Sequence, residues 1–234
     1  MANHPHIEET IEETYAGFRA RLDAEDKAGC VMFALSVLQS AVLDIPTFYE
    51  RIVAPAAREQ RCTMRQRALC IWEEHVRTSI LRTVIECCYP ELTKVRRLNG
   101  DPRTKGSALI VCPPEEYHEL GARMVTDLFT LCGFEVTFVG ANTPQQDILT
   151  AVTVVHPVLV GISITSPYNL IAARRTIQQL IALRTDTGGT FRIVAGGQAL
   201  KNDTCRATSW GVDLLAQSYD DIRRISEETP WPSR

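Results

Sequence analysis

Several features that mark other protein classes are missing from this 234-residue sequence. No apolar run approaches the roughly 18 to 20 residues that span a bilayer, which argues against a transmembrane helix. The first residues are acidic and no apolar segment follows them, so a secretory signal peptide is not expected. With 45% hydrophobic and 23% charged residues, the composition excludes a disordered chain and predicts a globular, cytoplasmic protein.

The sequence also lacks a basic excess, a cysteine framework and a phosphate-binding loop. It has 25 Lys and Arg against 28 Asp and Glu, so direct binding of nucleic acid is not expected. The eight cysteines never form Cys-x-x-Cys, which argues against a zinc site or a disulfide framework, and most of them are expected to be reduced core residues. Neither Gly-x-Gly-x-x-Gly nor Gly-Lys-Ser/Thr occurs at a strand end, which excludes the usual phosphate cradles.

The first half of the chain has the periodicity of helices. From Ile7 to about Tyr89 the apolar residues recur at helical spacing, and glycine is almost absent. The clearest apolar stripe consists of Leu69, Trp72, Val76, Ile80, Val84 and Cys87/Cys88. Breaks are expected near Asp23 to Asp26, at Asp44 to Thr47, at Arg61 to Arg65 and at Cys88 to Pro90. This pattern predicts a bundle of four to five helices.

The second half alternates short apolar runs with amphipathic segments. A polar stretch rich in Gly, Pro and Asp, from about 98 to 106, predicts a boundary between a helical domain, 1–100, and a second domain, 101–234. Strands are expected at 107–112, 134–139, 158–163, 191–195 and 212–216, with helices at 118–131, 144–155, 168–183, 201–209 and 220–228. The alternation predicts a Rossmann-like, five-stranded parallel sheet whose ligand lies at the carboxyl ends of the strands.

The loop after the first predicted strand carries a histidine with a nearby carboxylate. His118 could ligate a metal, and Glu116, two residues earlier, is placed to hydrogen-bond the other ring nitrogen and so fix the tautomer. The alternative is that His118 only caps or packs against the start of a helix. Spacing alone leaves both interpretations open.

Two further loops carry small or hydroxyl-bearing residues. Ser163 and Thr165 are two positions apart at the end of a predicted strand and therefore share a face. Gly196 and Gly197 follow the next strand, where the absence of side chains would let a flat ligand approach the backbone. Taken singly, each of these signals is also explained by ordinary turn chemistry.

Together, these motifs resemble the cobalamin-binding module. The residues that carry the likeness are Glu116-x-His118-x-x-Gly121, Ser163-x-Thr165 and Gly196-Gly197, against a family signature of Asp-x-His-x-x-Gly, Ser-x-Leu/Thr and Gly-Gly. In that family a helical bundle precedes the Rossmann-like domain and caps the upper face of the corrin, and the order of the two predicted domains agrees. The resemblance implies that His118 is the lower axial cobalt ligand with Glu116 as its partner, and that Ser163, Thr165, Gly196 and Gly197 line the slot for the displaced nucleotide tail.

Two sequence features resemble those of the light-sensing members of this family, which are of the CarH and LitR type. Glutamate at position 116 replaces the usual aspartate, and Glu74-His75 stand where those photoreceptors carry an upper-face Glu-His pair. The tryptophan that precedes the pair there is replaced here by Met64, which implies a wider upper pocket. Such a pocket could hold a different upper ligand, a direct bond from His75 to cobalt, or a second chromophore such as the biliverdin of the photocobilin group.

The resemblance therefore predicts a cobalamin-binding light sensor and not an enzyme. Light would change the upper ligation of cobalt, and the packing of the helical cap would then alter self-association in a light-dependent homo-oligomer, or the binding of a protein partner. The first alternative is a corrinoid protein that carries methyl groups between methyltransferases. The second is a redox or haem sensor that uses a similar domain without cobalamin.

Overall fold

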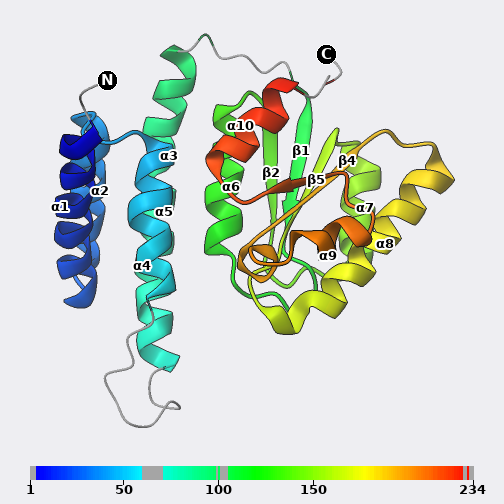
Figure 1. The fold of residues 1–234 in the computed structure, drawn as a ribbon, viewed down its shortest axis with the longest axis horizontal. Coiled ribbons are helices and arrows are strands. Elements are labelled where there is room, and N and C mark those ends of the chain that lie inside the picture. The colour runs from blue at the N-terminus through cyan, green and yellow to red at the C-terminus, as the bar shows by residue number, and fades with distance from the viewer. Residues whose placement is uncertain (1–3, 60–70, 99, 101–104, 229–230, 232–234) are drawn as a thin grey trace. The chain divides into compact units, whose positions relative to one another are not determined.

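The computed structural model describes residues 4–59, 71–98, 100, 105–228 and 231 (Figure 1). The chain divides into two compact units, Met1–Val95 and Arg96–Arg234. The boundary expected between residues 100 and 101 lies a few residues beyond this division. The first unit is helical, and the second holds a parallel sheet with helices on both faces, as the sequence predicts.

The helical unit buries an aromatic and aliphatic core. Its elements are α1 (His4–Asp23), α2 (Lys27–Gln39), α3 (Ile45–Phe48), a π-helical segment (Tyr49–Val53), α4 (Ala54–Arg58) and α5 (Ile71–Leu98). Phe18 of α1 and Phe48 of α3 are fully buried, with their rings edge to face and the centroids 5.9 Å apart. No helix in the described ranges is both long and apolar enough to cross a membrane.

The start of α3, at a break that the sequence predicts, depends on a side-chain cap. Asp44 is the N-cap residue, and its carboxylate accepts a hydrogen bond of 2.8 Å from the backbone N–H of Thr47. We expect Asp44→Ala to lower the free energy of unfolding by about 1 kcal/mol, because this backbone donor loses its partner. Urea unfolding followed by circular dichroism measures the change, and Asp44→Ser, which restores an acceptor, serves as the control. Equal losses in both variants would contradict a capping role.

Two expectations for the helical unit are wrong. The predicted break at Cys88 to Pro90 does not occur, because α5 continues through Pro90 to Leu98. Pro90 is exposed while Cys88 and Leu92 on either side of it are buried, so the buried apolar residues offset the hydrogen bond that proline removes. Trp72, expected in the core stripe, has 53% of its surface exposed. The break expected at Arg61 to Arg65 lies outside the described residues.

The second unit contains a five-stranded, all-parallel sheet. Its strands are β1 (Ser107–Val111), β2 (Glu135–Gly140), β3 (Leu159–Ser163), β4 (Arg192–Gly196) and β5 (Leu214–Ala216). They lie in the order β2-β1-β3-β4-β5. β1 is buried along its whole length and β3 along all but its last residue, as expected for central strands covered on both faces.

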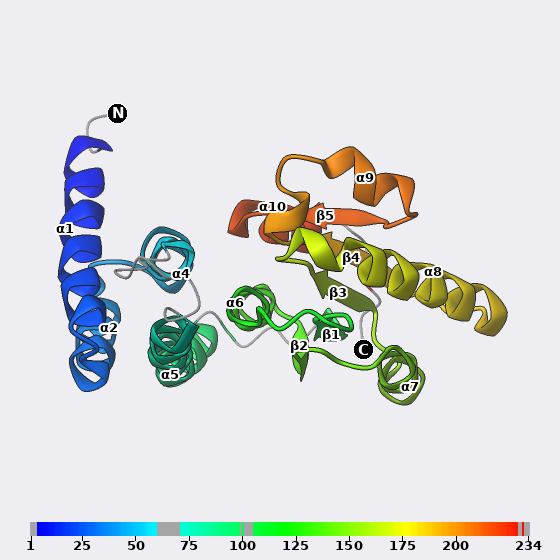
Figure 2. The same cartoon turned by 90° about the horizontal axis from the view of Figure 1, so that it is seen from below.

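Helices cover both faces of this sheet. The connecting helices are α6 (Leu120–Leu131), α7 (Gln145–Val155), α8 (Leu170–Thr187), α9 (Thr204–Ser209) and α10 (Tyr219–Glu228). Figure 2, which looks nearly along β1 and β2, shows α6 and α10 on one face and α7 and α8 on the other. The face toward α7 and α8 packs an aliphatic core around Val160, Ile162 and Ile177.

The strand order places a topological switch point between β1 and β3. After β1 the chain turns to one face through α6, and after β3 it turns to the other face through α8 (Figure 2). The loops that leave these adjacent strands therefore diverge at the carboxyl edge of the sheet. In open parallel sheets this is where ligands bind.

Candidate functional site

One buried carboxylate joins the two loops at the switch point. Glu116, in the loop after β1, has no exposed surface. Its Oε1 accepts hydrogen bonds from the His118 backbone N–H at 3.0 Å and from the His118 ring Nδ1 at 2.6 Å. Its Oε2 accepts from the backbone N–H groups of Thr165 at 2.8 Å and Ser166 at 2.9 Å, in the loop after β3. Residues about 50 positions apart are thus held by one side chain.

These donors keep Glu116 ionised. Burial by itself raises the pKa of this carboxyl, because a charge is costly away from water. The hydrogen bonds from the His118 ring and from the backbone of Ser166, His118 and Thr165 outweigh burial and lower the pKa of Glu116 from 4.5 to about 2. Glu116 is therefore a fixed anion at neutral pH and an acceptor of hydrogen bonds only.

His118 presents its ring at the surface of this edge. Although Glu116 is buried, 53% of the His118 side chain is exposed. Because Nδ1 lies 2.6 Å from the ionised Glu116 carboxylate, the neutral ring takes the tautomer with its proton on Nδ1, and Nε2 then carries the lone pair. This is the arrangement of a histidine ligand whose orientation and basicity are set by a carboxylate partner.

The glycine pair after β4 fits closely against its neighbours. A Cβ on Gly197 would lie 2.7 and 2.8 Å from the carbonyl carbon and the nitrogen of Ile164, and closer still to its oxygen. A Cβ on Gly196 would collide with the carbonyl oxygen of Ala216. Gly197 also has a φ of 108°, which side chains rarely adopt. Contacts with the protein's own backbone therefore already require both glycines.

Ser163 and Thr165 lie beside this pair. Ser163 is aligned with Gly196 in the register of β3 and β4, and the Ile164 N–H donates to the Gly196 carbonyl at 2.9 Å. Both hydroxyl-bearing side chains are half-buried. The structure thus brings the three sequence motifs to one edge of the sheet, at the ends of β1, β3 and β4.

The decisive comparison covers this same region. Residues 106–220 match the family model described as B12 binding domain, which extends from just before β1 into α10. Residues 106–220 are thus similar to B12-binding domains, and we call them the B12-binding domain. The switch-point edge with its exposed, carboxylate-held imidazole lies inside the B12-binding domain, and an imidazole nitrogen is a suitable ligand for a transition metal such as cobalt. The residues at this edge are therefore suited to binding a corrinoid.

The likeness to one solved structure extends beyond the B12-binding domain. The Methanosarcina barkeri monomethylamine corrinoid protein is 16% identical, with a TM-score of 0.72 over 93% of this chain and 98% of that chain. A cobalamin-binding protein from Desulfitobacterium hafniense DCB-2 is 17% identical, with a TM-score of 0.46 over 92% and 97% of the two chains. The methanol:cobalamin methyltransferase complex MtaBC of Methanosarcina barkeri is 14% identical, with a TM-score of 0.47 over 92% and 79%. No curated protein matches this sequence.

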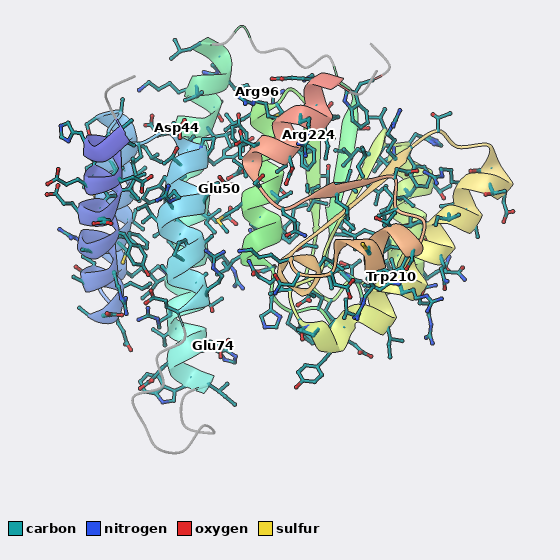
Figure 3. The ribbon with its side chains drawn as sticks, in the orientation of Figure 1. Asp44, Glu50, Glu74, Arg96, Trp210 and Arg224 are labelled. Carbon is teal, nitrogen blue, oxygen red and sulfur yellow. The ribbon has the colours of Figure 1, made fainter. Side chains whose placement is uncertain are left out.

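The remaining predicted site residues differ in their surroundings. Gly121, in the first turn of α6 in the B12-binding domain, is exposed and has open space where a Cβ would be. Glu74, which is labelled in Figure 3, belongs to the helical unit and is exposed near the start of α5. His75, the next residue, is exposed as well. Their relation to the B12-binding domain stays a prediction, and Met64 lies outside the described residues.

The B12-binding domain also contains polar residues that sequence reasoning missed. The Asn142 side chain accepts a hydrogen bond from the backbone N–H of Glu115 at 2.8 Å, and the Asn169 side chain donates to the Glu115 carbonyl at 3.0 Å. Glu115 has a φ of 70°, in the left-handed region. Asparagine and glutamate in loops form no spacing motif, so the sequence carries no signal that would have found these contacts.

A buried thiol beneath the loop has no reactive character. Burial, followed by the negative charges of Glu116 and Glu119, raises the pKa of Cys112 to about 12. Cys112 therefore stays protonated, and a protonated thiol is a poor nucleophile and metal ligand. Within the described residues, no group of three or more His, Cys, Asp or Glu side chains could hold a metal ion. Cys112 therefore lends no support to the alternative of a redox sensor.

Proposed function

We propose that this protein is a corrinoid carrier that presents a methyl group to methyltransferase partners and is not itself an enzyme. The single observation that carries corrinoid binding is the exposed His118 ring held by the buried, ionised Glu116 in a B12-binding domain. The carrier role is supported by the monomethylamine corrinoid protein, whose likeness covers both units. Such a carrier needs a partner enzyme, and that partner is part of the proposal.

Each residue of the site has a defined task in this proposal. His118 would bind the cobalt through Nε2, while Glu116 holds the proton on Nδ1 and fixes the plane of the ring. The N–H groups of Thr165 and Ser166 keep the carboxylate in place. A bound corrinoid supplies a cobalt centre that accepts a methyl group and gives it up again. Ser163, Gly196, Gly197 and Gly121 line the approach to His118 in this proposal.

The light-sensing interpretation finds less support than the carrier. It depends on Glu116 in place of aspartate and on Glu74 and His75, whereas the similar structure with a TM-score of 0.72 is described as a corrinoid protein. Nothing in the comparisons supports biliverdin binding. Light-dependent assembly of a homo-oligomer remains the measurable difference between the two functions.

Removing the proposed lower ligand tests corrinoid binding. We expect His118→Ala to weaken the binding of hydroxocobalamin by about 10- to 100-fold, as loss of a metal-site group typically does. Titration followed by absorbance measures affinity, and electron paramagnetic resonance of the Co(II) form reports nitrogen from ¹⁵N-labelled histidine. His6→Ala, which changes an exposed residue of α1, is the control and should keep both the affinity and the ¹⁵N signal. A ¹⁵N-histidine signal that persists in His118→Ala would contradict the proposal.

A second experiment separates a carrier from a light sensor. The protein is loaded with adenosylcobalamin, and its elution volume is compared in the dark and after illumination. A carrier should elute unchanged, and a corrinoid-loaded sample reduced and treated with labelled methyl iodide should retain the label through gel filtration in the dark. A light-dependent change of elution volume that His75→Ala abolishes would overturn the carrier in favour of the sensor.

A further inference from the structure

The loop that carries His118 contains a strained residue just before the site. Glu115 has a φ of 70°, in the left-handed region that L residues other than glycine, asparagine and aspartate seldom adopt. A residue in that conformation is strained and persists only where its surroundings hold it. The side chain of Glu115 is exposed, so its backbone is what the protein holds.

Two asparagines hold both peptide groups of Glu115. The backbone N–H donates to the Oδ1 of Asn142 at 2.8 Å, and the backbone carbonyl accepts from the Nδ2 of Asn169 at 3.0 Å. Asn142 lies in the loop after β2, whereas Asn169 lies after β3, in a 3-10 turn at the start of α8, and is only 7% exposed. Three loops of the carboxyl edge therefore meet at one residue.

Asn142 also contacts Glu116, the residue that follows Glu115. Its backbone N–H donates to the Glu116 carbonyl at 2.8 Å, and the N–H of Thr143 donates to the Cys112 carbonyl at 3.2 Å. The backbone is thereby fixed on both sides of the Glu116 Cα. From this fixed position the Glu116 side chain enters the interior while His118, two residues later, stays at the surface.

We infer that Asn142 and Asn169 are positioning residues for the His118 imidazole. They hold Glu115 in the left-handed conformation, which aims the Glu116 carboxylate at the ring and at the N–H groups of Thr165 and Ser166. Their contribution is to fix the ring before any ligand arrives. The part of this inference that concerns cobalt binding rests on the proposed corrinoid function.

The chemistry of the two amides allows a charge-matched pair of variants. Asn142→Asp keeps an oxygen that accepts from the Glu115 N–H, whereas Asn169→Asp replaces the NH₂ donor with an oxygen that faces the Glu115 carbonyl. Both add one negative charge to the same group of loops. We expect Asn169→Asp to weaken hydroxocobalamin binding by about tenfold, and Asn142→Asp to change it by less than about twofold.

A third variant tests whether the conformation of Glu115 is what the amides hold. Glycine adopts a φ near 70° without strain, so Glu115→Gly combined with Asn169→Asp should recover most of the lost affinity. Circular dichroism and thermal unfolding of each variant report whether the fold is retained. Equal losses in the two aspartate variants, or no recovery in the double variant, would overturn the inference.

A measurement on the corrinoid-free protein keeps this test independent of the proposed function. The ¹⁵N chemical shifts of the His118 ring report the Nδ1-protonated tautomer, which wild type and Asn142→Asp should retain. In Asn169→Asp we expect a mixture of tautomers, restored to one by Glu115→Gly. If wild type shows this ring signature yet binds no hydroxocobalamin, the carrier proposal fails and the positioning role stands. An unchanged tautomer in Asn169→Asp overturns the positioning role alone.

Discussion

Replacing Gly197 with alanine is expected to destabilise the B12-binding domain by about 4 kcal/mol. Gly197 has a φ of 108° and a ψ of 168°, a region essentially reserved for glycine, where a side chain costs about 1–3 kcal/mol in backbone strain. The added methyl group would also collide with the backbone of Ile164, and forcing apart packed groups costs about another 1–3 kcal/mol. Ile164 precedes Thr165, so the displaced loop also carries an N–H donor to Glu116.

Gly121 provides the matched control for this prediction. It belongs to the same set of sequence motifs, but nothing lies within 4 Å of a Cβ built on it, and it sits in the first turn of α6. Gly121→Ala should therefore leave the free energy of unfolding unchanged or raise it by up to about 1 kcal/mol, since alanine favours a helix. Urea unfolding of both variants, followed by circular dichroism, measures the difference. Equal effects at the two positions would contradict the close packing seen at Gly197.

The sequence predicts the elements of the B12-binding domain well because their patterns are local. Each predicted strand overlaps an observed one, since the buried strands are short apolar runs bounded by polar segments, and parallel order follows from the alternating helices. The resemblance predicts that Glu116 pairs with His118, but it does not predict the contact of Glu116 with the loop after β3. Thr165 and Ser166 donate through their backbone N–H groups, which any residue other than proline would supply, so the residue types at these positions give no signal.

The predictions from sequence are wrong where packing between distant residues decides the local structure. Proline at position 90 predicts a helix end, but the burial of Cys88 and Leu92 carries α5 past it. Trp72 follows the helical spacing of the core stripe and is nevertheless half exposed, since spacing identifies a face and not the length over which that face is covered. The left-handed Glu115 is held by asparagines 27 and 54 positions away, a relation that no local pattern contains.

Neutralising Glu116 is the second large effect that we expect. Because folding lowers the pKa of this carboxyl from 4.5 to about 2, its ionised form contributes about 3 kcal/mol to stability at neutral pH. Glu116→Gln removes that contribution and turns an NH₂ group toward the backbone N–H donors or the His118 ring. Free energies of unfolding from urea titrations at pH 7 should therefore differ by about 3 kcal/mol between wild type and variant.

The pH dependence gives this prediction its sign. A carboxyl whose folded pKa is depressed stabilises the protein above the unfolded pKa, and the stabilisation is lost as the pH falls toward the folded pKa. The difference between wild type and Glu116→Gln should thus be nearly constant above about pH 5, fall to about 40% of its full value near pH 3 and to about a tenth near pH 2. Glu115→Gln makes the same charge change on the exposed neighbouring side chain and should stay within about 0.5 kcal/mol of wild type throughout. A Glu116→Gln difference that does not vary between pH 7 and pH 3 would mean that the four hydrogen bonds do not favour the ionised form, and Glu116 could not then fix the tautomer of His118.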